Sequence, residues 1–216
     1  MSDHFSLSGR ARRRACVAAL LSPCIALLPQ RAQAGAQVEE PLADAVRSAL
    51  AAAVNDNSAP PEPVFDSVEE RLVFLRWLGE MSNRLKKRKA EHTVRVDFLK
   101  TLWYASKRAG LEPSLVLGLV QVESGFRKYA ISSVGARGYM QVMPFWARLI
   151  GDGDASRLFH VSTNLAFGCV ILRHYLDREK GDMYMALGRY NGSRGRPEYP
   201  NAVFASQRLW VYKPPA

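Results

Sequence analysis

The sequence holds little cysteine, and this scarcity excludes several kinds of site. Of the three cysteines in 216 residues, Cys16 and Cys24 fall within the first 34 residues and only Cys169 lies beyond them. A segment with a single thiol forms no internal disulfide and offers no thiolate cluster to a metal ion. Cys169 has apolar neighbours along the chain, so we expect it to pack in the core as a small hydrophobic residue.

The sequence also lacks the motifs of several common catalytic sites. It has no Gly-x-Ser-x-Gly elbow, no His-Glu-x-x-His helix and no phosphate-binding glycine-rich loop followed by Lys. The four histidines are scattered, and the acidic turn at 151–154 lacks the ligand spacing of a calcium loop. These absences argue against serine-nucleophile, zinc and nucleotide chemistry. We therefore predict no metal site and no cofactor.

The first 34 residues have the three parts of a secretory signal peptide. A positive region with Arg12–Arg14 precedes a largely apolar run at 15–28, and Ala-Gln-Ala at 32–34 supplies the small-x-small pattern of a cleavage site. The apolar run is shorter than the roughly 20 residues that span a bilayer, and Pro23 interrupts it. We predict cleavage before Gly35, export to the periplasm and no transmembrane segment afterwards.

Two alternatives concern the same N-terminal segment. Residues 21–24 resemble a lipobox, but Pro23 directly before Cys24 is unfavourable, so we do not expect lipoprotein anchoring at Cys24. Arg12–Arg14 leave twin-arginine export open beside the general secretory route. The chain without residues 1–34 carries 25 basic and 19 acidic side chains. This excess favours an anionic partner, such as a polyanionic polymer or a membrane surface, without choosing between them.

Beyond the signal, composition divides the chain into three segments. Residues 35–63 are rich in Ala and then in Asn, Ser and Pro, which predicts a flexible linker. Residues 64–93 predict an N-terminal amphipathic helical extension. Its apolar face is expected to hold Val68, Leu72, Leu75, Leu78 and Met81. Residues 94–210 form the main domain as further helices; since no convincing alternating strand pattern appears, we predict a mainly α fold with little or no β structure.

The most informative stretch runs from Leu115 to Gly125. It is apolar until its last turn, where Glu123 stands, and Gly125 is suited to end the helix. An apolar surrounding disfavours the charged form of a carboxyl group and raises its pKa, which suits proton donation near neutral pH. The alternative is that Glu123 caps the helix or lies in solvent. No Asp or Glu occurs between Glu123 and Gly151, and Glu198 is the more distant acid to test first as a second carboxylate.

An ordered series of short motifs follows this helix. Each motif alone is weak, but the order and spacing of all of them together are specific. The series consists of Glu123-Ser124-x-Phe126, Ala130-x-Ser132, Gly135-Ala136-x-Gly138, Met140-Gln141-x-Met143-Pro144, Asn164, Gly168, Tyr175, Tyr190-Asn191-Gly192 and Tyr199-Pro200. It resembles the catalytic domain of soluble-type lytic transglycosylases (SLT domain, family 1), which cleave bacterial peptidoglycan and share the goose-type lysozyme fold. The resemblance covers about Val94 to Gln207.

The resemblance implies that Glu123 is the only catalytic carboxylate. In that family the acid protonates the oxygen of the β-1,4 bond between N-acetylmuramic acid and N-acetylglucosamine, and the substrate's acetamido group stabilises the oxocarbenium-like centre. The same Glu then takes the proton of the muramic C6 hydroxyl. A 1,6-anhydro ring forms, and water is not the nucleophile.

The resemblance also implies which residues support the acid. They are Ser124, Gln141, Met143, Tyr190 and Asn191. The hydroxyl of Tyr190 is implied to approach Glu123, while Gln141 and Met143 line the sugar subsite. Ordinary roles stay open for some of them, because Ser124 suits a helix end and Met143 suits a core. The chain departs from the family at Tyr139, where Leu is common, which adds a stacking or hydrogen-bonding surface.

Three functions remain open at this point. The first is a monomeric periplasmic lytic transglycosylase that acts on peptidoglycan strands, with cell-wall machinery as a further partner and no nucleic acid. The second is a lysozyme-like hydrolase of the same fold, which needs a positioned water and a second carboxylate. The third is a non-catalytic glycan-binding factor of a cell-wall-spanning assembly.

Overall fold

Helices dominate the described part of the chain, and no β-strand forms there. The computed structural model describes residues 37, 39, 41, 44–57 and 65–214. These residues belong to the unit Ala32–Ala216, which is distinct from Met1–Arg31. The predicted signal peptide at 1–34, Cys24 included, and residues 58–63 of the predicted linker lie outside the described residues. The prediction of a mainly α fold is confirmed.

The helices follow one another with mostly short connections. Their bounds are α1 Asp44–Asn57, α2 Val68–Leu85, α3 His92–Arg108, α4 Pro113–Ser124, α5 Pro144–Ile150, the 3-10 helix η1 Ala155–Phe159, α6 Val161–Arg178, α7 Met183–Asn191 and α8 Glu198–Arg208. The long connection between α4 and α5 holds two isolated β-bridges, which join Arg137 to Ile131 and to Val142. We call residues 125–143 the site loop.

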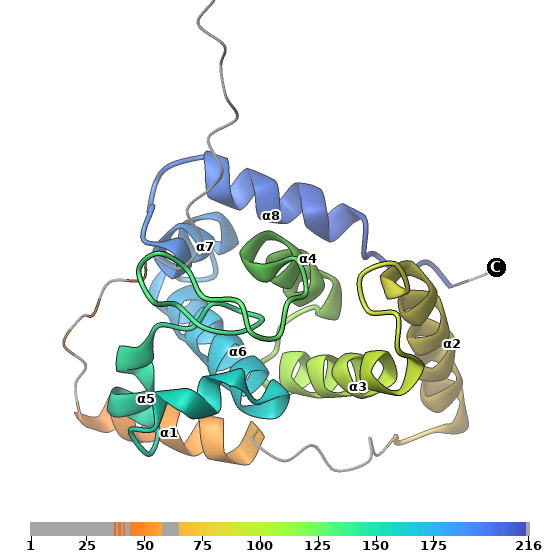
Figure 1. Ribbon diagram of the computed structural model, residues 1–216, viewed down its shortest axis with the longest axis horizontal. Coiled ribbons are helices and arrows are strands. Elements are labelled where there is room, and N and C mark those ends of the chain that lie inside the picture. Colours follow the sequence, from red (N-terminus) through yellow and green to blue (C-terminus); the bar gives the residue numbers. More distant parts are fainter. Residues whose placement is uncertain (1–36, 38, 40, 42–43, 58–64, 215–216) are drawn as a thin grey trace, which may run out of the picture. The chain divides into compact units, whose positions relative to one another are not determined.

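Two apolar helices, α4 and α6, lie in the middle of the helical array (Figure 1). Helix α6 packs against α1, α3 and α7, and α4 packs against α3 and, most extensively, α8. Both central helices are buried over most of their length because their apolar residues cover more than one face. Cys169 of α6 lies fully in this core, as predicted.

Helix α1 occupies part of the range that the sequence predicts as a flexible linker. It packs against α5 and α6, with Val54 buried and Leu50 and Ala51 partly buried against the core. The Ala-rich composition that resembles a linker also favours a helix, and a few apolar side chains give that helix a surface to pack on. Residues 44–57 are therefore an ordered part of the fold.

The predicted apolar face of α2 is wrong at its N-terminal half. Val68, Leu72 and Leu75 are 69%, 46% and 48% exposed. The buried side is formed by Phe74, Trp77, Leu78, Met81, Ser82 and Leu85. Aromatic side chains bury more area than Leu. The ring of Phe74 stacks on that of Trp77 and packs at a tilt against that of Phe65, so these aromatic side chains set which face of α2 is buried.

Local signals set several helix ends. Ser67 accepts the backbone N–H of Glu70 at the start of α2, and Glu91 accepts those of Thr93 and Val94 at the start of α3, as N-cap residues do. Gly110 ends α3 with a φ of +64°, as the sequence predicts. No helix within the described ranges combines the length and apolar character needed to cross a membrane.

Candidate active site

Helix α4 carries Glu123 into the interior. The helix begins at Pro113, whose ring suits the first turn, and ends at Gly125 in the left-handed conformation with φ +57°. Glu123 stands one residue before the end and is only 5% exposed. The sequence interpretation of this stretch is therefore confirmed in geometry: an apolar helix presents one buried carboxyl group at its last turn.

Close packing of α4 on α8 brings a tyrosine to that carboxyl group. A Cβ atom at Gly118 would lie 2.6 Å from the backbone nitrogen of Gln207 in α8, so the two helix backbones meet at a distance that only glycine permits. On the same helix pair, the Tyr199 hydroxyl donates a hydrogen bond to Glu123 Oε1. Both side chains are buried.

Burial shifts the acidity of Glu123 strongly. Desolvation raises its pKa from the usual 4.5 to about 8, and the hydrogen bond from Tyr199 opposes part of that rise. The second oxygen, Oε2, is buried and has no hydrogen-bond partner among the described residues. Below about pH 8 the group is therefore a neutral carboxylic acid, with one oxygen held by a phenol and the other available to carry a proton.

The other acids that follow Glu123 in the sequence are engaged elsewhere or face solvent. Three of these acids form ion pairs with Arg side chains, namely Asp152, Asp177 and Glu179. Two others, Asp154 and Asp182, accept backbone N–H groups at helix starts. Glu198 is exposed at the first residue of α8. No carboxyl group is among the causes that shift the pKa of Glu123.

The hydroxyl that bonds to the acid belongs to Tyr199 and not to Tyr190. The resemblance implies that the Tyr190 hydroxyl approaches Glu123. This hydroxyl donates to the backbone oxygen of Met140 at 2.8 Å, and burial together with the nearby charge of Glu123 raises the pKa of Tyr190. Tyr199 stands in the motif series without an assigned role. Its position in the first turn of α8, beside the exposed Glu198, points it inward onto α4. The helical phase of α8, which buries Tyr199 and exposes Glu198, is the sequence signal for this contact.

The predicted residues around the acid bind the backbone of the site loop. The Ser124 hydroxyl donates to the carbonyl of Tyr139 at 2.7 Å. The side-chain amide of Gln141 donates to the carbonyls of Ala130 and Gly138 at 3.1 and 2.9 Å. Gln141 itself adopts a positive φ of 49°. Together with Tyr190, these side chains fix the loop over the end of α4.

A residue of α6 completes this framework. Asn164 is fully buried and accepts the N–H of Met140 at 2.8 Å, while its amide donates to the carbonyls of Arg137 and Leu158 at 2.9 and 2.8 Å. Gly138 leaves room for it, since a Cβ there would lie 2.4 Å from the Asn164 amide nitrogen. The motif position Asn164 thus ties the site loop to the core.

The remaining predicted residues lie at the edge of this arrangement. Met143 is the partly buried residue before α5, and its N–H donates to the side-chain oxygen of Gln37 at 3.3 Å. Asn191 ends α7 and donates to Ser193 at 3.1 Å, while its own side-chain oxygen is buried without a partner among the described residues. The structure thus brings Ser124, Gln141 and Tyr190 together through the site loop.

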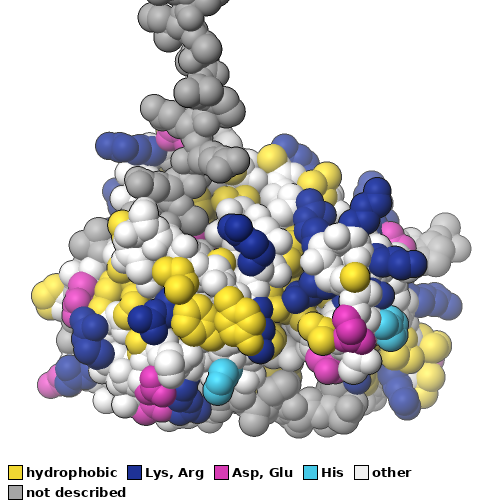
Figure 2. Space-filling model, viewed as in Figure 1, with side chains coloured by type: hydrophobic (Ala, Val, Ile, Leu, Met, Phe, Trp, Pro, Cys, Tyr) yellow, Lys and Arg dark blue, Asp and Glu magenta, His cyan; other side chains and the backbone are white. Residues whose placement is uncertain are grey.

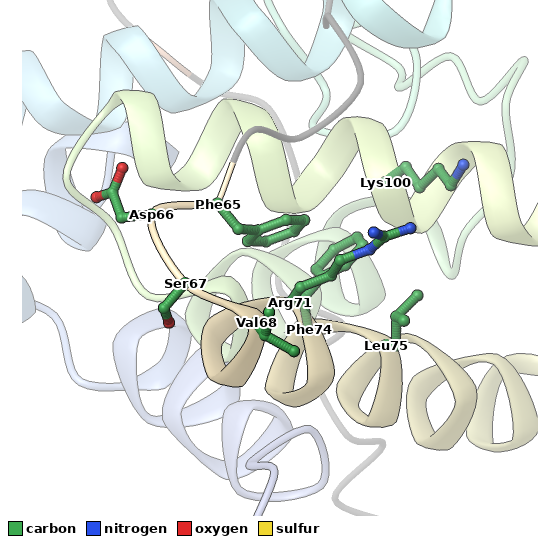
Figure 3. Close-up of a pocket in the computed structure, with 8 residues that line it drawn as sticks. All are labelled: Phe65, Asp66, Ser67, Val68, Arg71, Phe74, Leu75 and Lys100. Atoms are coloured by element: carbon green, nitrogen blue, oxygen red, sulfur yellow. The ribbon is translucent and has the colours of Figure 1, made fainter.

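Four surface cavities found on the described part do not have Glu123 in their lining. One, of about 600 Å³, lies between the start of α2 and α3 and is lined by Phe65, Phe74 and the cationic Arg71 and Lys100 (Figure 3). The described residues contain no group of three or more His, Cys, Asp or Glu that could hold a metal ion.

The class of this domain follows from a family match over the same residues. Residues 101–204 match the family model described as Transglycosylase SLT domain. The resemblance drawn from the motifs is thereby confirmed: this region, which holds Glu123, the site loop, Asn164 and Tyr199, matches the SLT domain.

Similar proteins carry related names. The chain is 37% identical to a transglycosylase of Enterobacteria phage PRD1 over 104 residues. This alignment covers 48% of this chain and 38% of that protein. Membrane-bound lytic murein transglycosylase C of Actinobacillus pleuropneumoniae is 38% identical over 105 residues, 42% of this chain and 29% of that one. The protein of the same name from Mannheimia succiniciproducens is 48% identical over 113 residues, which cover 45% of this chain and 32% of that protein. The chain therefore spans less than two fifths of these relatives.

A solved structure is also similar. The lytic transglycosylase Slt of Pseudomonas aeruginosa, solved as an inactive mutant, aligns with 65% of this chain and 27% of its own, at 20% identity and a TM-score of 0.43.

Proposed function

We propose that the protein is a peptidoglycan lytic transglycosylase in which Glu123 acts first as acid and then as base. The observation that carries the proposal is the neutral, buried carboxyl group of Glu123 at the end of α4, with a pKa of about 8. A general acid works best when its pKa lies near the working pH. The SLT-domain match and the names of the relatives support the reaction class.

The first step is protonation of the leaving group. Oε2 of Glu123 carries the proton, since Oε1 accepts from Tyr199. Transfer of this proton to the β-1,4 glycosidic oxygen lets the bond to the muramic C1 break, and the N-acetylglucosamine leaves with a restored 4-hydroxyl. The positive charge at C1 is stabilised by the substrate's own acetamido oxygen, so no second protein carboxylate is needed.

The second step returns the proton. The Glu123 carboxylate removes the proton of the muramic C6 hydroxyl, and that oxygen closes onto C1 to form 1,6-anhydro-N-acetylmuramic acid. No water is consumed, and the acid is regenerated. The hydrogen bond from Tyr199 stabilises the carboxylate between the steps, because a donor to the charged form favours it.

The framework of the site suits this chemistry. Ser124, Gln141 and Tyr190 hold the site loop through backbone carbonyls, and we propose that this loop with Met143 and Asn191 forms the sugar-binding wall. A wall fixed by buried hydrogen bonds keeps the glycosidic oxygen near the acid without reorganisation. We also propose a periplasmic location, with cleavage of residues 1–34, and no resident metal or cofactor.

Mass spectrometry of digested sacculi tests the proposal. Soluble fragments with 1,6-anhydromuramic ends are expected; reducing muramic ends instead indicate a lysozyme-like hydrolase, and binding without soluble fragments indicates a glycan-binding factor of a cell-wall assembly. Glu123→Gln should lower the rate by a factor on the order of 100 to 10,000. Full activity of that variant would refute the assignment of Glu123.

A further inference from the structure

Lys89 lies in the loop between α2 and α3 and contacts Tyr139, the position at which the family that the sequence resembles often has Leu. Its ammonium group donates to the Tyr139 hydroxyl at 2.6 Å and lies 4.8 Å from the centre of that ring and 5.3 Å from the centre of the Phe98 ring. Such distances are typical of cation–π contacts. Lys89 is therefore held in one place although it comes from outside the SLT-domain match.

Three further cations surround this position. Lys128 lies close enough to lower the pKa of Lys89 by charge repulsion, in addition to the larger effect of burial. Arg127 donates through Nε to the carbonyl of Ser124 at 2.9 Å. Arg88 lies 5.8 Å from the centre of the Phe126 ring. We call Arg88, Lys89, Arg127 and Lys128 the cationic cluster.

Aromatic rings, a hydroxyl group and a backbone carbonyl, and not carboxylates, contact these cations. The Lys128 ammonium lies 5.1 Å from the centre of the Tyr129 ring, and no ion pair joins a member of the cluster to an acid of the described residues. The acid nearest to Lys89 in sequence, Glu91, is occupied by the backbone N–H groups at the start of α3. The positive charge of the cluster is thus uncompensated.

The cluster is connected directly to the acid site. Tyr139 binds Lys89 through its hydroxyl and Ser124 through its carbonyl, and Ser124 follows Glu123. Figure 2 shows Lys and Arg side chains gathered over the loop between α2 and α3, on the face where Figure 1 shows the site loop. A ligand whose reacting bond lies at Glu123 and which carries negative charge nearby would meet this cluster.

We propose that the cationic cluster binds the carboxylates of the peptide stem on the muramic sugar, with Lys89 and Lys128 as the main contacts. This inference rests on the proposed function, because it takes peptidoglycan as the ligand. The stem is attached to the sugar whose C1 bond is broken, and it carries free carboxylates. A carboxylate between Lys89 and Lys128 removes their mutual repulsion and replaces it by two charge-assisted hydrogen bonds.

The experiment measures binding separately from cleavage. Full-length protein with Glu123→Gln is titrated onto glycan strands that carry stems and onto the same strands stripped of stems by an amidase. Stem removal should weaken binding about tenfold. Lys89→Met with Lys128→Met should abolish this difference, because the Met side chains keep the apolar packing but lose the charge, and higher salt should reduce it.

Two matched variants complete the design. Lys86→Met removes an exposed charge from the same loop and should leave the stem dependence intact. Lys89→Arg keeps the positive charge at position 89 and should also retain the stem dependence. If the double variant still prefers stem-bearing strands, or loses affinity equally for both kinds of strand, the cationic cluster does not bind the peptide stem. Absence of anhydro products with the unmodified protein would instead refute the proposed function, and the binding comparison would still decide the stem contact.

Discussion

Replacing Glu123 by Gln should make the protein more stable at alkaline pH while it removes activity. The side chains have nearly the same shape, and Tyr199 can still donate to the remaining carbonyl oxygen. What changes is ionisation. A buried carboxyl group whose pKa is raised favours folding only while it is protonated, so the stability it confers is complete below pH 4.5 and is lost as the pH rises to about 8.

The size of this effect follows from the two pKa values. A folded value of about 8 against an ordinary value of 4.5 corresponds to about 5 kcal/mol at about 1.36 kcal/mol per pH unit. The variant should therefore resemble the parent at pH 4 and exceed its free energy of unfolding by up to about 5 kcal/mol at pH 9. Against typical total stabilities of about 5–15 kcal/mol, this is a large fraction.

Urea unfolding of both proteins between pH 4 and pH 9 measures the difference. With a denaturant dependence of about 1–3 kcal/mol per molar urea, the midpoints should separate by roughly 2 M or more at the alkaline end. Contributions from all other titrating groups cancel because both proteins contain them. A difference that stays constant over the whole pH range would mean that Glu123 ionises normally, and the argument for a buried general acid would fail.

Three further substitutions probe the supports of the acid. Tyr199→Phe removes the hydrogen bond to Glu123 and should raise the pKa of Glu123 further by about one unit, since bonds to charged groups contribute about 1.5–3 kcal/mol. The pH at which activity falls on the alkaline side should then rise. An unchanged pH dependence would contradict the contact. Asn164→Ala leaves three buried backbone groups without a hydrogen-bond partner and should lower the free energy of unfolding by about 3–5 kcal/mol. Thermal unfolding measures this, with the exposed Asn83→Ala as control. Gly118→Ala should destabilise the α4–α8 contact and lower activity, whereas Gly79→Ala, with nothing within 4 Å of the new Cβ, should stabilise slightly; equal effects of the two would remove the steric argument.

The sequence predicts well what depends on a single helix. The apolar run of α4, the glycine at its end and the isolation of Glu123 among apolar neighbours are local properties, and the structure retains all three. The same holds for Gly110 at the end of α3. Short-range geometry is sufficient for such predictions.

What the sequence could not settle depends on contacts between distant elements. The partner of Glu123 is Tyr199, 76 residues away, and its contact with the acid depends on how α8 is rotated against α4. The buried face of α2 likewise depends on the rings of Phe65 and Trp103 that meet Phe74. In each case the helix is correctly expected, but its rotation is set by tertiary packing.

The attachment of the site loop to Asn164 also bears on how activity arises during folding. The loop contains no helix or strand of its own, only two isolated bridges, and Asn164 binds groups 24 and 27 residues earlier in the chain. Contacts so far apart in sequence close late, after their loop entropy has been offset by other packing. A chain caught partway through folding, even one with α4 already helical, therefore has an acid but no wall beside it. If the proposed function holds, glycan cleavage requires that α6 has docked.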